Sequence, residues 1–311
     1  MHSYWYRDDC DLARMLALTS AAYRHDGPFA GFLYSGDIVW GLFQNLTIDP
    51  TTRVRLFDDA SGDLAGFVWI YPPNAFALQM RPGTDLVAPM VRWAEHHLRA
   101  TADTPPETLS IDVPAADETQ KAALAALGYR DTGHADYQLN HRDLRAGSLP
   151  DISLADGAIV RPVRLDDPAE VAARVGLHLE VWTPSRFTGD GYDRLRTKPV
   201  YRPDLDLVVV TPAGELASYC IVWWDPASRI GEFEPVGTAE RFRGRGYGAA
   251  LMRDGLRRLR ALGADHAVVI SSTSENFAPS RRLYAASGFD VAFRYETWSR
   301  PLAPAAPAAN R

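Results

Sequence analysis

The sequence predicts an α+β chain of two tandem domains, each a mixed, mostly antiparallel sheet flanked by helices. Short apolar segments with strand character alternate with segments of helical periodicity along the chain. The order of these segments in residues 1–145 recurs in residues 158–300. In the second copy, two strands joined by a short turn lead into a glycine-rich turn, which is typical of an antiparallel hairpin.

The first domain, residues 1–145, starts with a strand and a helix and ends with a helix closed by Gly128. Turn-forming residues at 58–63 and 72–74 separate its central strands. We expect strands at 3–7, 52–57, 64–71, 75–80 and 108–113, helices at 10–23, 85–98 and 117–127, and an amphipathic stretch at 37–45.

A polar linker at 146–157 leads to the second domain, residues 158–300. Asp225 opens the turn between its two central strands, and Gly288 closes its last helix. We expect strands at 216–224, 229–238, 267–271 and 291–298, a helix from the glycine-rich turn to residue 262, and a helix at 280–287. Residues 301–311 are rich in proline and alanine and are expected to form a disordered tail.

The glycine-rich turn Arg243-Gly-Arg-Gly-Tyr-Gly248 opens a helix and is suited to bind a phosphate group. Its glycines let the backbone bend with N–H groups exposed, and these amides lie at the positive end of the helix dipole. Arg241, Arg243 and Arg245 add charge-assisted contacts. The Gly-Lys-Ser/Thr ending of a P-loop is missing. The glycine pattern of a dinucleotide-binding motif is also present. That motif, however, follows the first strand of a parallel βαβ unit, whereas this turn follows a hairpin.

With a second motif downstream, this turn resembles the GCN5-related N-acetyltransferase (GNAT) superfamily over roughly residues 158–300. The matching residues are Arg243-x-x-Gly246-x-Gly248 and the segment 276–289, which contains Leu283-Tyr284. The resemblance implies that acetyl-CoA is the co-substrate, that turn amides hold its diphosphate, and that the preceding strand bonds its pantetheine arm. Asn276 resembles a family residue that bonds the pantetheine or the sheet, but it is equally suited to cap a helix. The cofactor-binding candidates are Val236, Gly237, Thr238, Arg243, Gly244, Arg245, Gly246, Tyr247, Gly248, Ala249 and Asn276.

Three residues of the second domain are candidates for the acid–base chemistry of acyl transfer. A general base lowers the barrier because an alkylamine is mostly ammonium at about pH 7. Glu232 and Glu234 share one face of their strand through its two-residue period. Glu232 matches by position the carboxylate of several relatives and is preferred, although Glu234 lies closer to the turn. The resemblance places Tyr284 beside the CoA sulfur, where its protonated phenol can donate to the departing thiolate.

The first domain lacks the corresponding functional residues. Leu124 stands where the second domain has Tyr284. The glycine turn is reduced to residues 80–84, and Pro82 removes an N–H donor. The strand at 75–80 carries no carboxylate. We therefore predict a degenerate copy that kept the fold and lost the chemistry.

Acceptor specificity in this superfamily comes from the first helices and loops of the catalytic domain, here residues 177–196. The stretch 39–44 of the first domain is a candidate wall of the same groove. The acceptor is expected to be a small-molecule or peptide amine. The side chains that are candidates to line the acceptor site are Trp182, Arg186, Phe187, Tyr192 and Tyr219.

Composition argues against several other classes of protein. A net charge of −6 over 311 residues disfavours a nucleic-acid partner. Cys10 and Cys220 provide no disulfide framework, and no Cys/His cluster has zinc spacing, so no metal is expected. The sequence shows no signal peptide or long apolar run. We therefore expect a cytoplasmic protein without a membrane partner, as a monomer or homodimer.

The leading hypothesis is an N-acetyltransferase that moves an acetyl group from acetyl-CoA to a primary amine by direct attack in a ternary complex. The alternative is a noncatalytic acyl-CoA-binding sensor. A sensor needs the glycine turn but not a strand carboxylate together with Tyr284. The presence of all three features favours the enzyme.

Overall fold

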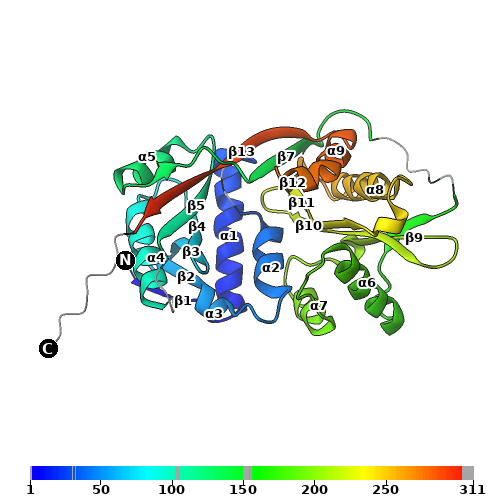
Figure 1. Ribbon diagram of the computed structural model, residues 1–311, viewed down its shortest axis with the longest axis horizontal. Helices are drawn as coiled ribbons and strands as arrows, with labels where there is room; N and C mark the ends of the chain where they lie inside the picture. The colour runs from blue at the N-terminus through cyan, green and yellow to red at the C-terminus, as the bar shows by residue number, and fades with distance from the viewer. Residues whose placement is uncertain are drawn as a thin grey trace.

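The computed structural model describes residues 2–29, 31, 33–101, 106–149, 154 and 156–302. Apart from short extra turns, its elements follow the same order in the two halves of the chain (Figure 1). The first half contains β1 (His2–Trp5), α1 (Asp9–Asp26), α2 (Ser35–Phe43), α3 (Pro50–Arg53), β2 (Val54–Asp58), β3 (Leu64–Tyr71), β4 (Ala75–Met80), α4 (Val87–Thr101), β5 (Thr108–Pro114), α5 (Glu118–Ala126), β6 (Arg130–Asp131) and β7 (Tyr137–Asp143). The second half contains β8 (Ile159–Pro162), α6 (Pro168–Val181), α7 (Gly189–Arg196), η1 (Pro203–Leu205), β9 (Asp206–Val210), β10 (Leu216–Asp225), β11 (Ile230–Thr238), η2 (Glu240–Phe242), α8 (Tyr247–Ala261), β12 (His266–Ser272), η3 (Glu275–Phe277), α9 (Ala278–Ala286) and β13 (Asp290–Pro301).

Side-chain caps set the start of several helices. Asp8 accepts a hydrogen bond from Cys10 N at the start of α1, and Asp167 accepts one from Ala169 N at the start of α6. Helix α8 differs, because it begins after Gly246 and has no side-chain cap among the described residues. Its first amides are therefore left for another partner. In the described ranges, no helix is long and apolar enough to cross a bilayer.

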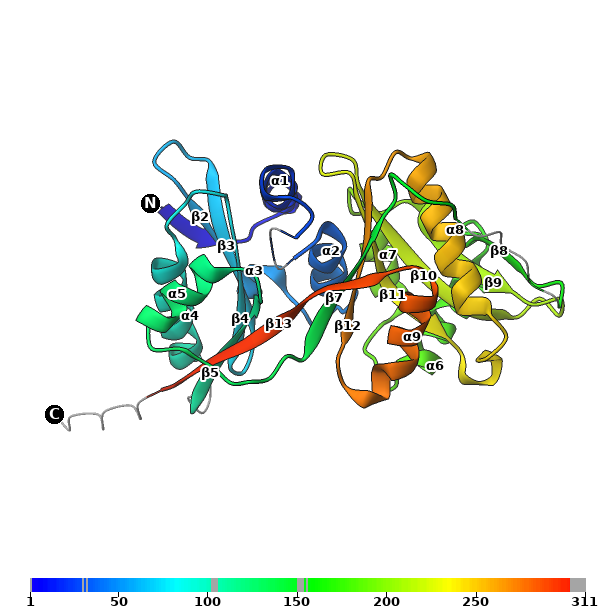
Figure 2. The same ribbon diagram turned by 90° about the horizontal axis from the view of Figure 1, so that it is seen from above.

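The described strands join one sheet through an exchange of the last strand of each half. Their order is β1-β2-β3-β4-β5-β13-β7-β12-β11-β10-β9-β8, with β6 paired to β13. Strand β7 of the first half pairs antiparallel with β12, while β13 of the second half pairs antiparallel with β5. The two exchanged strands also pair with each other where they bridge the halves (Figure 2). Each half thus completes the sheet of the other.

Helix α2 belongs to the first half but packs on the strands of the second half. Helix α1 packs on β3 and β4 of the first half, whereas α2 packs on β10 and β11 of the second. Figure 2 shows α1 and α2 between the two parts of the sheet. Gly36 permits this contact, because a Cβ there would lie 2.2 Å from the Trp223 ring and 2.4 Å from a Glu232 oxygen. On the opposite face, α8 packs on the same strands where Gly255 meets Phe233.

The last strand extends further than the sequence predicts. Pro301 ends β13, and Leu302 is buried in the first-half core with its N–H bonded to Glu107 O at 2.8 Å. These two residues correct the expectation of a disordered tail from residue 301, because pairing with β5 orders them. The remainder of that tail, residues 303–311, lies outside the described residues.

Candidate active site

The glycine-rich turn has the backbone geometry of an anion site. Gly244 and Gly246 have φ of +80° and +82°, a region that favours glycine. Among the described residues, no backbone amide from Gly244 to Ala249 donates a hydrogen bond, and the first to donate is Ala250 N, to Gly246 O at 3.0 Å. These amides lie at the N-terminus of the 15-residue helix α8, whose dipole favours negative charge.

The side chains of the turn face different surroundings. Arg241 is engaged with Glu180, so it points away from the amides. Tyr247 is buried and its hydroxyl donates to the carboxylate of Asp156, so its side chain holds the turn in place. Arg243 is exposed and forms no ion pair with another described residue. Its guanidinium, like that of the exposed Arg245, can therefore add a charged contact at the turn.

Helix α9 packs directly against the start of α8 and brings Tyr284 close to the turn. A Cβ on Gly248 would lie 3.1 Å from Leu283 Cδ2, so the two helices meet at this glycine. The Tyr284 side chain is only 6% exposed. Burial and the negative charge of Glu234 raise the pKa of the Tyr284 phenol, so this group stays protonated at neutral pH.

Strands β11 and β12 separate beside the turn. Residues 230–232 of β11 pair in parallel with residues 266–268 of β12, and the pairing ends there. Beyond this point, β11 pairs with β10 alone, so no described strand covers its other edge at residues 233–238. That edge contains the predicted residues Val236, Gly237 and Thr238. An uncovered strand edge offers N–H and C=O groups to an extended ligand.

The two carboxylates on β11 have different environments. Glu232 is 3% exposed and accepts hydrogen bonds from Gly36 N at 2.8 Å and Asp37 N at 3.2 Å. Its carboxylate thus binds the N-terminal amides of α2, where the helix dipole favours negative charge. Glu234 is half-buried and lines the cavity described below. Glu234 is therefore the more accessible of the two.

Asp37 of α2 forms a carboxylate cluster with Glu232 and Glu234. One oxygen of each residue lies within 4.8 Å of the others, close enough to share a proton or contact one cation. Asp37 also accepts a hydrogen bond from Tyr34 N at 2.9 Å, which fixes it at the start of its helix. Burial raises the pKa of all three carboxyl groups, and the charge of Asp37 raises those of Glu232 and Glu234 further.

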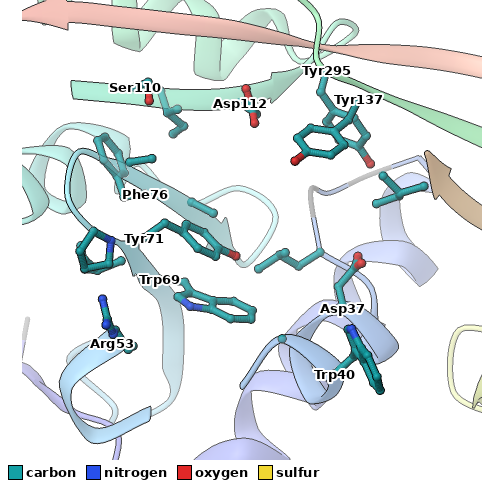
Figure 3. Close-up of a pocket in the computed structure, with 18 of the residues that line it drawn as sticks. Asp37, Trp40, Arg53, Trp69, Tyr71, Phe76, Ser110, Asp112, Tyr137 and Tyr295 are labelled. Atoms are coloured by element: carbon teal, nitrogen blue, oxygen red, sulfur yellow. The ribbon is translucent and has the colours of Figure 1, made fainter. Parts of the chain in front are cut away.

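A cavity of 620 Å³ extends from Asp37 and Glu234 into the first half. Its walls come from α2, α3, β3, β4, β5 and β7 of the first half and from β11, β12 and β13 of the second. Figure 3 shows Asp37, Tyr137 and Tyr295 on one side of this space and aromatic side chains of β3 on the other. Its volume is in the range of pockets that bind one small molecule, roughly 300–1,000 Å³.

Two predicted acceptor-site residues, Tyr192 and Tyr219, belong to the core instead. Both are fully buried. The Tyr192 hydroxyl donates to Asp206 Oδ2 at 2.6 Å, and the Tyr219 hydroxyl lies 2.7 Å from His178 Nδ1. A buried phenol needs such a partner, so these tyrosines serve packing and internal hydrogen bonding. We do not carry them into the proposed acceptor site.

The other predicted side chains also lie outside the cavity. Trp182 stacks on Phe277 with 6.1 Å between ring centroids, and Phe187 is buried. Arg186 is exposed. Asn276 is exposed in the short helix before α9, and it makes no capping hydrogen bond to another described residue. Asn276 is therefore accessible, and its contact with the cofactor stays a prediction.

Sequence reasoning missed most of what the first half contributes. Trp40 and Gly41 line the cavity and fall within the stretch 39–44 predicted as a wall. Asp37 stands in the sequence only as the start of an amphipathic stretch. Tyr34, the residue before α2, is not a usual N-cap, so the sequence gives no clear signal for the start of this helix. No local signal joins Asp37 to Glu232, because their contact depends on how the halves pack.

Comparison with known proteins supports this reading of the fold. Residues 177–289 match the family model described as the acetyltransferase (GNAT) family. A tandem GNAT protein from the clavulanic acid biosynthesis pathway is similar over 98% of this chain and 99% of its own, at 18% identity and a TM-score of 0.66. A GCN5-related N-acetyltransferase from Sphaerobacter thermophilus is similar over 97% and 96%, at 20% identity and a TM-score of 0.60. No curated protein matches the sequence.

At these identities the similarity concerns the fold. It confirms the predicted α+β architecture of two tandem domains, each with a mixed sheet flanked by helices.

Proposed function

We propose that this chain, whose residues 177–289 match the GNAT acetyltransferase family model within a fold similar to a tandem GNAT protein, is an acyl-CoA-dependent N-acyltransferase for a primary amine. The observation that carries the proposal is the position of β11. Its Glu234 lines the cavity, and its C-terminal end leads into the turn whose amides have no partner among the described residues. A ligand along the open edge of β11 therefore lies between an anion site and a base.

The residues present fit acetyl-CoA. The amides of 244–249 and the Arg243 guanidinium are suited to its diphosphate, and the edge at 236–238 is suited to its pantetheine arm. Space is available above the turn, because no described heavy atom lies within 4 Å of a Cβ built on Gly244 or Gly246. When bound, the group supplies an activated acetyl thioester. The remaining chemistry comes from the side chains of this chain.

Glu234 is the general base in this proposal. It accepts a proton from the acceptor ammonium, and its raised pKa makes its carboxylate a stronger base. Glu232 instead holds the start of α2 through its two amide hydrogen bonds. Accessibility thus favours Glu234 over the residue preferred from sequence position.

Tyr284 is the general acid in this proposal. The neutral amine nitrogen attacks the thioester carbonyl carbon, so a C–N bond forms and the C–S bond breaks. Tyr284 donates its phenolic proton to the departing sulfur and regains a proton from solvent. The nitrogen loses its second proton, and one proton is released overall for each ammonium acetylated.

Paired glutamine variants test the assignment of the base. With the best acceptor from a broad amine panel, Glu234→Gln is expected to lower thiol release from acetyl-CoA by ~100-fold or more. Glu232→Gln is the matched control, because its amide oxygen can still accept from Gly36 N. A larger loss in Glu232→Gln would move the role of base to that residue.

Binding measurements test the function itself. Calorimetry is expected to show acetyl-CoA binding to the unchanged protein. No binding of acetyl-CoA or longer acyl-CoA would contradict the proposed function. Binding without transfer to any amine of the panel would instead support the noncatalytic sensor.

A further inference from the structure

The cavity lies where strands β4 and β5 of the first half separate. These strands pair in parallel only at Ala75 and Ser110. In the second half, β11 and β12 pair in parallel over three residues and then also separate. The first half therefore has an opening that corresponds to the one at which we propose the second half binds the thioester.

The opening in the first half has the side chains of a cavity and not those of a diphosphate site. Ala75, Ala77 and Ser110 line it with small side chains. The turn after β4 contains Pro82, which has no N–H to donate. The space between β4 and β5 is thus open to a different kind of ligand.

The charged groups of the cavity favour a cation. Its lining contains the carboxylates of Asp37, Asp112 and Glu234, against a single guanidinium from Arg53. Oxygens of Asp37 and Glu234 lie within 4.8 Å of each other, so an ammonium nitrogen with hydrogen bonds of ~2.8 Å reaches both at once. Asp112 already accepts a hydrogen bond from Thr297 at 2.7 Å, so Asp37 and Glu234 together form the better ammonium site.

The remaining wall is flat and aromatic. The rings of Trp69 and Tyr71 stack on each other, 5.0 Å apart at 23°, and form one surface of the cavity. The Trp69 ring is held in place by α2, because a Cβ on Gly41 would lie 2.4 Å from it. Trp40 and Tyr137 also line the space. Such surfaces bind flat apolar groups by stacking and stabilise a nearby cation.

On the basis of the acyltransferase function proposed above, we infer that this cavity is the acceptor site and that it takes a small primary amine on a flat apolar or aromatic skeleton. The ammonium lies between Asp37 and Glu234, and the skeleton extends along Trp69 and Tyr71 into the opening between β4 and β5. The first half thus uses the position of a former cofactor opening to hold the acceptor. A volume of 620 Å³ suits one such molecule.

A filling variant tests this site without altering its carboxylates. Ala75→Trp places a large side chain in the opening, and Ser110→Phe fills it from the neighbouring strand if the first variant fails to fold. Ala60→Trp is the matched control, because Ala60 is exposed in the turn between β2 and β3. The probes are acetyl-CoA with tryptamine and phenethylamine, compared with ethanolamine and the dipeptide glycylglycine. Thiol release gives kcat/KM, and calorimetry gives the Kd of acetyl-CoA.

We expect the aromatic amines to exceed ethanolamine and glycylglycine by ~10-fold or more in kcat/KM. The filling variants should lower the aromatic values by ~10-fold or more, with an unchanged Kd for acetyl-CoA and an unaffected Ala60→Trp control. Equal use of ethanolamine or the dipeptide, normal activity of the filling variants, or reaction of ethanolamine or the dipeptide without reaction of either aromatic amine would overturn the inference. Failure of acetyl-CoA to bind the unchanged protein would instead count against the proposed function.

Discussion

Replacing Asp37 by asparagine tests whether the first half tunes the base of the second. Asparagine keeps an oxygen that can accept from Tyr34 N, so the start of α2 should persist. The change removes a negative charge beside Glu234. Because the charge of Asp37 raises the pKa of Glu234, its loss is expected to lower that pKa. The base then becomes deprotonated at lower pH, so the acid limb of the rate profile moves to lower pH.

The size of the effect follows from the spacing of the carboxylates. Two unit charges 4.8 Å apart repel by roughly 3.5 kcal/mol at an effective dielectric constant of ~20 and by roughly 0.9 kcal/mol at that of water. Since ~1.4 kcal/mol corresponds to one pH unit, the acid limb is expected to move by between ~0.6 and ~2.5 pH units. The half-buried position of Glu234 places the expected value between these limits.

The measurement is kcat/KM against pH for thiol release, with one amine used for every protein. Asp117→Asn is the matched control, because Asp117 also caps a helix, α5, but lies outside the cluster. Its profile should coincide with that of the unchanged protein. An acid limb of Asp37→Asn that stays in place or moves to higher pH would refute the coupling between Asp37 and the base.

Three further changes have defined outcomes. Tyr284→Phe keeps the packing of α9 but removes the proton donor. Turnover should therefore fall by ~10- to 100-fold while the Kd of acetyl-CoA stays the same. Unaltered turnover would exclude Tyr284 as the general acid. Gly246→Ala should weaken acetyl-CoA binding in calorimetry. Gly62→Ala is its control, because Gly62 has a similar φ of +89° and equally open surroundings, so this change should strain the backbone without affecting binding. Equal Kd values in both variants would contradict the anion site. The pKa of Glu232 is raised in the folded protein, so the folded state keeps a proton on Glu232 that the unfolded chain loses above ~pH 4.5. The free energy of unfolding should therefore decrease as the pH rises above ~4.5. Chemical denaturation should show a shallower decrease in Glu232→Gln, and an identical pH dependence would exclude this source.

Local sequence patterns predicted the elements around the proposed cofactor site well. The segments 216–224 and 229–238 form the antiparallel hairpin of β10 and β11, and the helix after the turn is α8. The expected strand start at residue 52 was wrong, because Asp49 and Pro50 begin a short helix, α3, before β2. That Asp-Pro pair was a readable signal, since it supplies a cap and a first helical residue.

The exchange of β7 and β13 was not predictable from the same patterns. Alternation of apolar residues shows which face of a strand is buried, but it does not name the neighbouring strand. Most of the proposed acceptor site was not predicted for a related reason, because an aromatic residue gives the same sequence pattern whether it lines a cavity or the core. The buried Arg174 guanidinium lies over the Tyr219 ring, with 3.7 Å between Arg174 Cζ and the ring centre. This contact is visible only in three dimensions.

The exchanged strands also determine when and from what the molecule can be assembled. During synthesis β13 emerges after the other described strands. Until then, the edge of β5 that faces away from β4 is unpaired, and β7 has only one of its two partners. A gene fragment that encodes either half alone therefore encodes an incomplete sheet. The proposed acyl transfer would therefore need both halves, and any attempt to express residues 158–300 alone should include a substitute for residues 137–143.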